Sequence, residues 1–393
     1  MLTRRDFTAL IGGAAASAAL PGCLSPVRDG AYSVSVLGDM HYDVFPPERY
    51  HAAAIAKWKP TGAHPARLKE FERNARMWQD ICGRILASSS ACVRPDAAFA
   101  LQLGDLVQGD CESDELHRQM LSEATGLLEK AYPNLPVVSV CGNHDIREGD
   151  RDEGAAEAYA AFMRPYESRQ LRTFLPQGVR TTTFGFRCGP DLWIALDFNF
   201  GRRDAGIVRR LLAENGDARH TFVVTHGPVL PMAFWRCRWF YLGGCEDAAL
   251  RREMRALFAK RQAIVLAGHA HSLELKDWYG DGGRITETVL NTCAGMSDGH
   301  GYFPAEPDVD SDDPADYGKW AFGPDAAKLG PHSRPAKNAP DMATLFDEYR
   351  PGLRRYFAAR AVGHHVLRVT DDAVELDYYG RDARTPTRTF SLR

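Results

Sequence analysis

Short apolar runs recur along the chain, and five of them end at a cluster of polar residues. They occupy residues 32–37, 97–103, 136–141, 221–225 and 263–267. Runs of this length, rich in Val, Leu and Ile, are typical of strands that are covered on both faces. We therefore predict five buried strands whose carboxyl ends carry polar side chains.

Between some of these runs, the apolar positions follow a helical period instead. Residues 66–87, 114–131 and 247–260 each place apolar side chains along one stripe of a helix. In the second of these helices, the stripe consists of Leu116, Met120, Leu121, Leu127 and Leu128. Alternation of strands and helices predicts an α/β domain that binds ligands at the carboxyl ends of its strands.

The second half of the chain adds further strand-like segments and one stretch without periodicity. The strand-like segments cover residues 192–196, 285–293, 365–369 and 374–379. The last two are separated by Asp371-Asp372, which indicates a closing hairpin. Residues 299–341 are rich in Pro, Asp and Gly, and we expect a loop-rich insertion there. Because no linker divides the chain, residues 29–393 are predicted to form a single domain.

The first 28 residues differ from the rest and resemble an export signal. Arg4-Arg5 precedes Phe7 and an Ala-rich apolar run over residues 9–20. A basic start followed by a short apolar region is typical of a signal peptide, and paired arginines resemble the twin-arginine type. The segment Leu20-Pro21-Gly22-Cys23 also resembles a bacterial lipoprotein cleavage box, although Pro21 is atypical of it. We expect export to the periplasm or cell envelope. Whether Cys23 is lipidated stays open, and contact with the membrane is expected only through such a lipid.

Composition narrows the classes of function. The 393 residues carry a net charge of −3, so the chain lacks the excess of Lys and Arg with which nucleic-acid binders neutralise phosphates. Its nine cysteines include no C-x-x-C pair, which argues against a thiolate zinc site. In an exported protein, Cys237 and Cys245 are the expected disulfide pair because they lie close in sequence. Cys141 and Cys293 lie in apolar runs and are expected to be buried thiols.

The polar ends of the five apolar runs contain the candidate functional residues. In chain order they read Gly38-Asp39-Met40-His41, Gly104-Asp105, Gly142-Asn143-His144-Asp145, Thr225-His226-Gly227 and Gly268-His269-Ala270-His271. Residues two apart on an extended backbone point the same way, so each D-x-H or H-x-H pair can face one site. A preceding glycine lets the backbone turn sharply and approach closely. Carboxylate, imidazole and amide ligands together favour Mn, Fe or Zn over Ca.

The order of these motifs, D-x-H, GD, GNHD, H and GHxH, resembles that of the calcineurin-like metallophosphoesterases, over roughly residues 33–293. The resemblance implies a four-layer α/β/β/α sandwich of two mixed β-sheets and a centre with two divalent metal ions. By position, the first ion would be bound by Asp39, His41 and His271. The second would be bound by Asn143, His226 and His269, with Asp105 bridging the two ions.

His144 is the candidate catalytic residue, because the resemblance implies that the His of GNHD stands beside the phosphate without binding metal. It would act as general acid or phosphate donor; the alternative is a hydrogen-bond donor that only supports the ligands. Protein serine/threonine phosphatases of this superfamily carry GDxVDRG, where this chain has Gln108 and Gly109 in place of the second Asp and the Arg. The carboxylate that would orient His144 is therefore missing, and Asp110 and Asp145 are candidates to replace it.

These features predict hydrolysis of a small phosphomonoester or phosphodiester by a water that two metal ions activate. The departure from GDxVDRG argues against a protein phosphatase. The alternative is an exported lipoprotein whose dinuclear centre is structural or binds a phosphate ligand without turnover. Substrate choice is expected to lie in residues 44–66, in residues 299–341 and in the aromatic stretch with Trp235, Trp239, Phe240 and Tyr241. The sequence leaves the substrate, the metal and the oligomeric state open.

Overall fold

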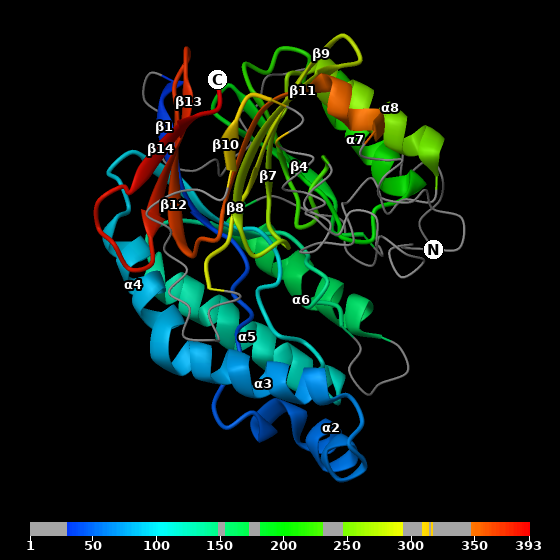
Figure 1. Cartoon of the computed structure of the whole chain (residues 1–393), viewed down its shortest axis with the longest axis vertical. Helices are drawn as coiled ribbons and strands as arrows, with labels where there is room; N and C mark the ends of the chain where they lie inside the picture. The colour runs from blue at the N-terminus through cyan, green and yellow to red at the C-terminus, as the bar shows by residue number, and fades with distance from the viewer. Residues whose placement is uncertain are drawn as a thin grey trace.

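The computed structural model describes residues 30–147, 154–172, 181–230, 247–293, 309–313, 316 and 347–393. Within them, two β-sheets lie face to face and helices cover both outer sides (Figure 1). The prediction of a four-layer sandwich of two mixed sheets is confirmed. No helix in the described ranges is long and apolar enough to cross a membrane.

The first sheet has six strands in the described residues, in the order β14-β13-β12-β1-β2-β3. Its members are β1 (Tyr32–Leu37), β2 (Ala97–Gln102), β3 (Val137–Ser139), β12 (Gly363–Val369), β13 (Val374–Gly380) and β14 (Arg388–Ser391). Strands β1, β2 and β3 are parallel, whereas β12 pairs with β1 in antiparallel fashion. The predicted hairpin through Asp371-Asp372 joins β12 to β13.

The second sheet has eight strands in the described residues, in the order β10-β11-β8-β9-β7-β6-β5-β4. Its members are β4 (Phe184–Cys188), β5 (Asp191–Ala195), β6 (Thr221–Val224), β7 (Ile264–Ala267), β8 (Leu273–Gly280), β9 (Gly283–Val289), β10 (Val309–Ser311) and β11 (Leu353–Ala359). Strands β5, β6, β7 and β9 are parallel, and the others pair in antiparallel fashion.

The core between the sheets is built from alternating residues of the strands. Val34 and Val36 of β1 and Phe99 and Leu101 of β2 point inward from the first sheet. They meet inward residues of the second sheet, where the Trp193 and Phe222 rings stack with centroids 4.1 Å apart. The alternate residues face outward onto helices, so both sheets are buried on two sides, as their apolar runs predict.

The helices in the described residues are α2 (Glu48–Thr61), α3 (Pro65–Met77), α4 (Gly83–Ala91), α5 (Asp114–Ala131), α6 (Ala155–Gln170), α7 (Arg202–Glu214) and α8 (Ala248–Lys260). A short π-helical segment, Trp78–Cys82, joins α3 to α4, and a 3₁₀ turn covers Arg350–Gly352. Helices α5 and α6 pack on the first sheet. Helices α7 and α8 pack on the second.

Some predictions concern segments outside the described residues. These are the export signal with Cys23, the Cys237 and Cys245 pair, the aromatic stretch at 235–241 and most of residues 299–341. Two other cysteine predictions are confirmed, because Cys141 and Cys293 are buried free thiols.

Candidate metal centre

The five predicted strand ends meet at one place, and both sheets contribute. Asp39 and His41 follow β1, Asp105 follows β2, and Asn143 and His144 follow β3. The second sheet contributes His226 after β6, and His269 and His271 after β7. Asp39, His41, Asp105 and His226 are each no more than 2% exposed. Carboxyl ends of strands from two facing sheets thus enclose a buried polar cluster.

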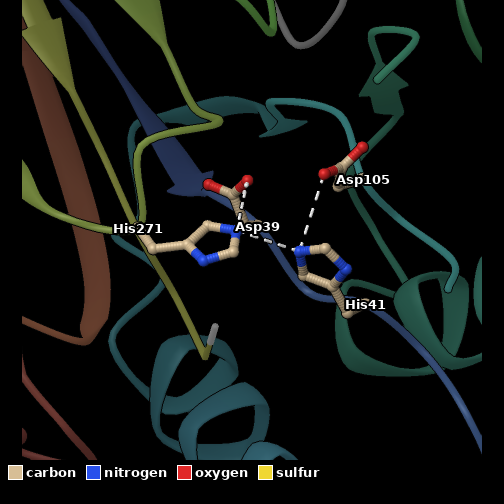
Figure 2. A group of neighbouring side chains, drawn as sticks. All are labelled: Asp39, His41, Asp105 and His271. Carbon is tan, nitrogen blue, oxygen red and sulfur yellow. Dashed lines mark hydrogen bonds and ion pairs between the residues drawn. The ribbon is translucent and has the colours of Figure 1, made fainter. Parts of the chain in front are cut away.

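A first ligand group consists of Asp39, His41, Asp105 and His271, each of which offers one ligand atom within 4.8 Å of the others. Figure 2 shows the His41 and His271 rings directed toward one another beside the two carboxylates. The Nε2 atom of His41 lies 3.2 Å from Nε2 of His271 and 3.5 Å from Oδ2 of Asp105. The Nε2 atom of His271 lies 3.6 Å from Oδ1 of Asp39.

A second ligand group consists of Asp105, His226 and His269, so that Asp105 belongs to both groups. The Nε2 atom of His226 is 3.2 Å from Oδ2 of Asp105 and 3.1 Å from Nδ1 of His269. It is also 3.2 Å from Oδ1 of Asn143. The Nδ1 atom of His226 lies 2.8 Å from the Leu103 carbonyl, to which it can donate, leaving an electron pair on Nε2 for a metal.

Burial and mutual charge set the protonation of these side chains. Burial lowers the pKa of His41 and His271, and it lowers that of His269 to about 3, so these imidazoles are neutral at pH 7. Burial raises the pKa of Asp39 to about 7. Burial also acts to raise the pKa of Asp105. The charges of His226, His144 and His41 outweigh this effect and hold the pKa of Asp105 well below its usual range.

The ligand atoms of the two groups are of the types that bind divalent metal ions. Imidazole nitrogens and carboxylate oxygens converge on two points that share Asp105, and these are the ligand types that Mn, Fe and Zn take. The Nε2 atoms of His41 and His271 face each other at 3.2 Å, and a cation beside them would accept both electron pairs. The grouping of these residues therefore suggests a dinuclear divalent metal centre.

The backbone of the site is held in sparsely populated conformations. His41, Asp105, His269 and His271 have φ of 46°, 50°, 72° and 53°, although none of them is glycine. A non-glycine residue in this region costs of order 1 kcal/mol or more and persists only where surrounding contacts enforce it, which happens mainly at functional sites. Four of the seven candidate ligands share this conformation, which also occurs at turn residues such as Gln262 and Asp281.

His144 lies beside the first ligand group and is oriented by the main chain. Its ring meets that of His41 edge to face, with centroids 4.3 Å apart, and its backbone N–H donates to Asp105 at 2.7 Å. Its Nδ1 lies 3.0 Å from the carbonyl oxygen of Gln108. Neither carboxylate candidate takes that place. Asp145 accepts from the N–H groups of Val107 and Gly142, and Asp110 pairs with Arg147.

Sequence reasoning missed two residues next to His144. Arg147 places Nη2 2.7 Å from Nε2 of His144, and its Nη1 lies 3.2 Å from Oε2 of Glu70. Glu70 belongs to α3, a helix that the apolar stripe predicts without indicating that it reaches the site. A signal existed for Arg147, because it lies two positions beyond GNHD in the same turn.

The fold and the paired ligand groups are those of a metallophosphoesterase. The chain belongs to the calcineurin-like phosphoesterase family, whose model matches residues 32–273. No curated protein matches the sequence.

A solved phosphatase structure has a similar fold. A purple acid phosphatase from yellow lupin (Lupinus luteus) is similar with a TM-score of 0.52 at 12% identity. That match covers 93% of this chain and 54% of the lupin protein, so the chain spans about half its relative's length. PhoD, at 10% identity, has a TM-score of 0.49, and the match covers 94% of this chain and 73% of that one. A dimetal phosphatase from Danio rerio, at 12% identity, also has a TM-score of 0.49, with 93% and 99% covered.

Proposed function

We propose that this protein hydrolyses a small phosphomonoester or phosphodiester with the help of two divalent metal ions. The observation that carries the proposal is the sharing of Asp105 between two adjacent ligand groups. In the proposed assignment the first ion is held by Asp39, His41 and His271. The second would be held by Asn143, His226 and His269, and Asp105 would contribute to both ion sites.

Two such ions would supply an activated water and fixed positive charge for the phosphate oxygens. The chain's own residues hold that arrangement: Leu103 orients His226 through its carbonyl, and the backbone N–H of His269 donates to both oxygens of Asp39, at 2.9 and 3.0 Å. His144 is the proposed acid–base group beside the phosphate, because its ring lies beside the first group while its Nδ1 is fixed by Gln108. Burial holds its pKa well below the usual range and its Nε2 accepts from Arg147, so it would carry a proton for the leaving oxygen only transiently.

The test compares p-nitrophenyl phosphate with bis-p-nitrophenyl phosphate. Purified protein is stripped of metal and reloaded separately with Mn, Fe and Zn, because the ligand set accepts all three. We expect metal-dependent turnover that Asp105→Ala abolishes. The matched control is Asp217→Ala, whose side chain is 79% exposed. Two bound ions per chain without turnover of either ester would instead support a non-catalytic phosphate-binding centre.

We also propose that the chain is exported, on the sequence of its first 28 residues. Replacing Arg4-Arg5 by Lys-Lys should retain the protein in the cytoplasm, which cell fractionation measures. Labelling with a radioactive fatty acid would show whether Cys23 carries lipid.

A further inference from the structure

The guanidinium of Arg147 is held beside the metal centre by two other segments of the chain and by its own turn. Its Nη1 donates to Asp110 at 3.0 Å and to Glu70 of α3 at 3.2 Å. Its Nη2 lies 2.7 Å from Nε2 of His144. The side chain is 21% exposed, so the guanidinium is anchored but still reachable from solvent.

The backbone at Gly109 explains why the positive charge beside the site comes from position 147 and not from position 109. Gly109, which stands where the related phosphatases have their arginine, has φ +66°. A Cβ placed there would lie 2.0 Å from the carbonyl oxygen of His144 and 3.4 Å from the side chain of Arg147. No side chain fits at position 109, and the space beside it is taken by Arg147.

We propose that Arg147 binds the phosphate of the substrate and makes the site favour phosphomonoesters over phosphodiesters, with Glu70 as its positioning residue. This inference deepens the proposed function and rests on it. The planar guanidinium of arginine can donate two parallel hydrogen bonds to a phosphate, and such charge-assisted bonds are among the strong ones. Nη1 donates to Asp110 and Glu70, and one hydrogen of Nη2 is directed at Nε2 of His144, which leaves the second hydrogen of Nη2 for the phosphate.

Charge decides the preference between the two esters. A phosphomonoester carries about two negative charges near neutral pH, whereas a diester carries one and blocks another oxygen with its second alcohol. A fixed guanidinium beside two divalent ions therefore stabilises the monoester more.

Arg147→Ala and Arg147→Lys test the phosphate contact. The control is Arg76→Ala, on the exposed face of α3, where Arg76 is 54% exposed. Binding of inorganic phosphate to the metal-loaded proteins is measured by titration calorimetry, and metal content by elemental analysis. We expect Arg147→Ala to keep both ions but to bind phosphate about 10- to 100-fold more weakly, with Lys intermediate. The value of kcat/KM should fall similarly for the monoester and less than about threefold for the diester.

Glu70→Gln tests the positioning role against Glu72→Gln, which changes an exposed carboxylate on the same helix. Glu70→Gln should reduce the ratio of monoester to diester kcat/KM, and Glu72→Gln should leave it unchanged. An equal loss for both esters would show a merely structural role and overturn this part of the inference.

The outcomes separate this inference from the proposed function. Wild-type turnover with unchanged phosphate affinity in Arg147→Ala would overturn the inference alone. Loss of metal from Arg147→Ala would do the same, since it would make Arg147 a support of the centre. If the wild type turns over neither ester, the proposed function fails and the phosphate titration still decides whether Arg147 binds the anion.

Discussion

Single glycines allow the segments of the metal centre to touch. A Cβ at Gly142 would lie 2.1 Å from the backbone nitrogen of Asp105 and 2.3 Å from its Oδ1. A Cβ at Gly104 would meet the ring of His226 at 2.6 Å. The glycine before each polar residue, which permits close approach, thus brings the ligand-bearing turns against one another.

Gly142→Ala should disrupt the centre, because the added methyl displaces Asp105, the carboxylate common to both ligand groups. We expect loss of one or both ions, and a loss of stability of about 1–3 kcal/mol from overpacking. The matched control is Gly126→Ala on α5, where nothing lies within 4 Å of the added Cβ. That change should stabilise the helix by about 0.5–1 kcal/mol. Full metal content in Gly142→Ala would contradict the prediction.

Glu167 of α6 is predicted to make stability depend on pH. Burial raises its pKa well above 4.5, and Asp197 adds to this against the opposing charge of Arg164. The folded state therefore binds a proton more tightly than the unfolded chain, so stability is full below about pH 4.5 and falls as pH rises through the folded pKa. Glu167→Gln should melt at a higher temperature than wild type at pH 8 and lose that advantage at pH 4.5. A difference between the two proteins that is the same at both pH values would refute it.

Helices and strands with a regular apolar pattern can be predicted from the sequence, whereas a strand with buried polar residues cannot. Helix α5 was predicted with its observed bounds, because its apolar stripe is clear and Ser113 caps its first turn by accepting from Leu116. Strand β8 was missed because Glu274 and Lys276 interrupt its apolar pattern, although both are fully buried. Helix α2 lies within residues 44–66, for which the sequence predicts a role in substrate choice but no helix. Whether Glu70 reaches the site depends on how α3 packs against the rest of the protein. No local sequence pattern gives that packing.

The buried polar residues of β8 form a charged network with β9. Lys276 pairs across the strands with Glu287 at 2.9 Å and lies 3.7 Å from Glu274. Glu287 also accepts from the N–H groups of Val229 and Leu230, at 2.5 and 3.1 Å, in the segment that follows His226. The network therefore ties the second sheet to one of the turns that bear candidate ligands.

Lys276→Met should destabilise the protein by about 3–5 kcal/mol, because it leaves two buried carboxylates without their cation. Chemical denaturation measures the change. Lys69→Met, at an exposed position of α3, is the control and should stay within about 0.5 kcal/mol of wild type. Equal effects from the two substitutions would show that the network contributes little.

At the scale of the whole molecule, the candidate centre lies across the junction of the two sheets. Asp39, His41, Asp105 and Asn143 come from the first sheet, and His226, His269 and His271 from the second. Ions bound there would join the sheets and stabilise the folded state by mass action, by about 2.7 kcal/mol when free metal is 100 times the Kd. Each half alone offers too few ligands to complete either group.

Removal of metal should therefore lower the melting temperature of the whole molecule. Scanning calorimetry of metal-loaded and chelated protein measures the shift, and Asp217→Ala should show the same shift as wild type. In Asp105→Ala the shift should largely disappear. A melting temperature that is unaffected by chelation in the wild type would mean that the seven residues do not bind metal in the folded protein.

The pairing of β12 with β1 has a consequence for the order of events during synthesis. Tyr32 pairs with Val369 and Val36 with His365, so the strand that leads to Asp39 and His41 gains one of its neighbours only from the far end of the chain. All candidate ligands are translated by residue 271, well before β12. A nascent chain that ends at residue 361 would carry every motif yet leave β1 as an exposed strand edge. We expect such a fragment to bind no metal, which equilibrium dialysis would measure, so that the centre forms only after β12 has been synthesised.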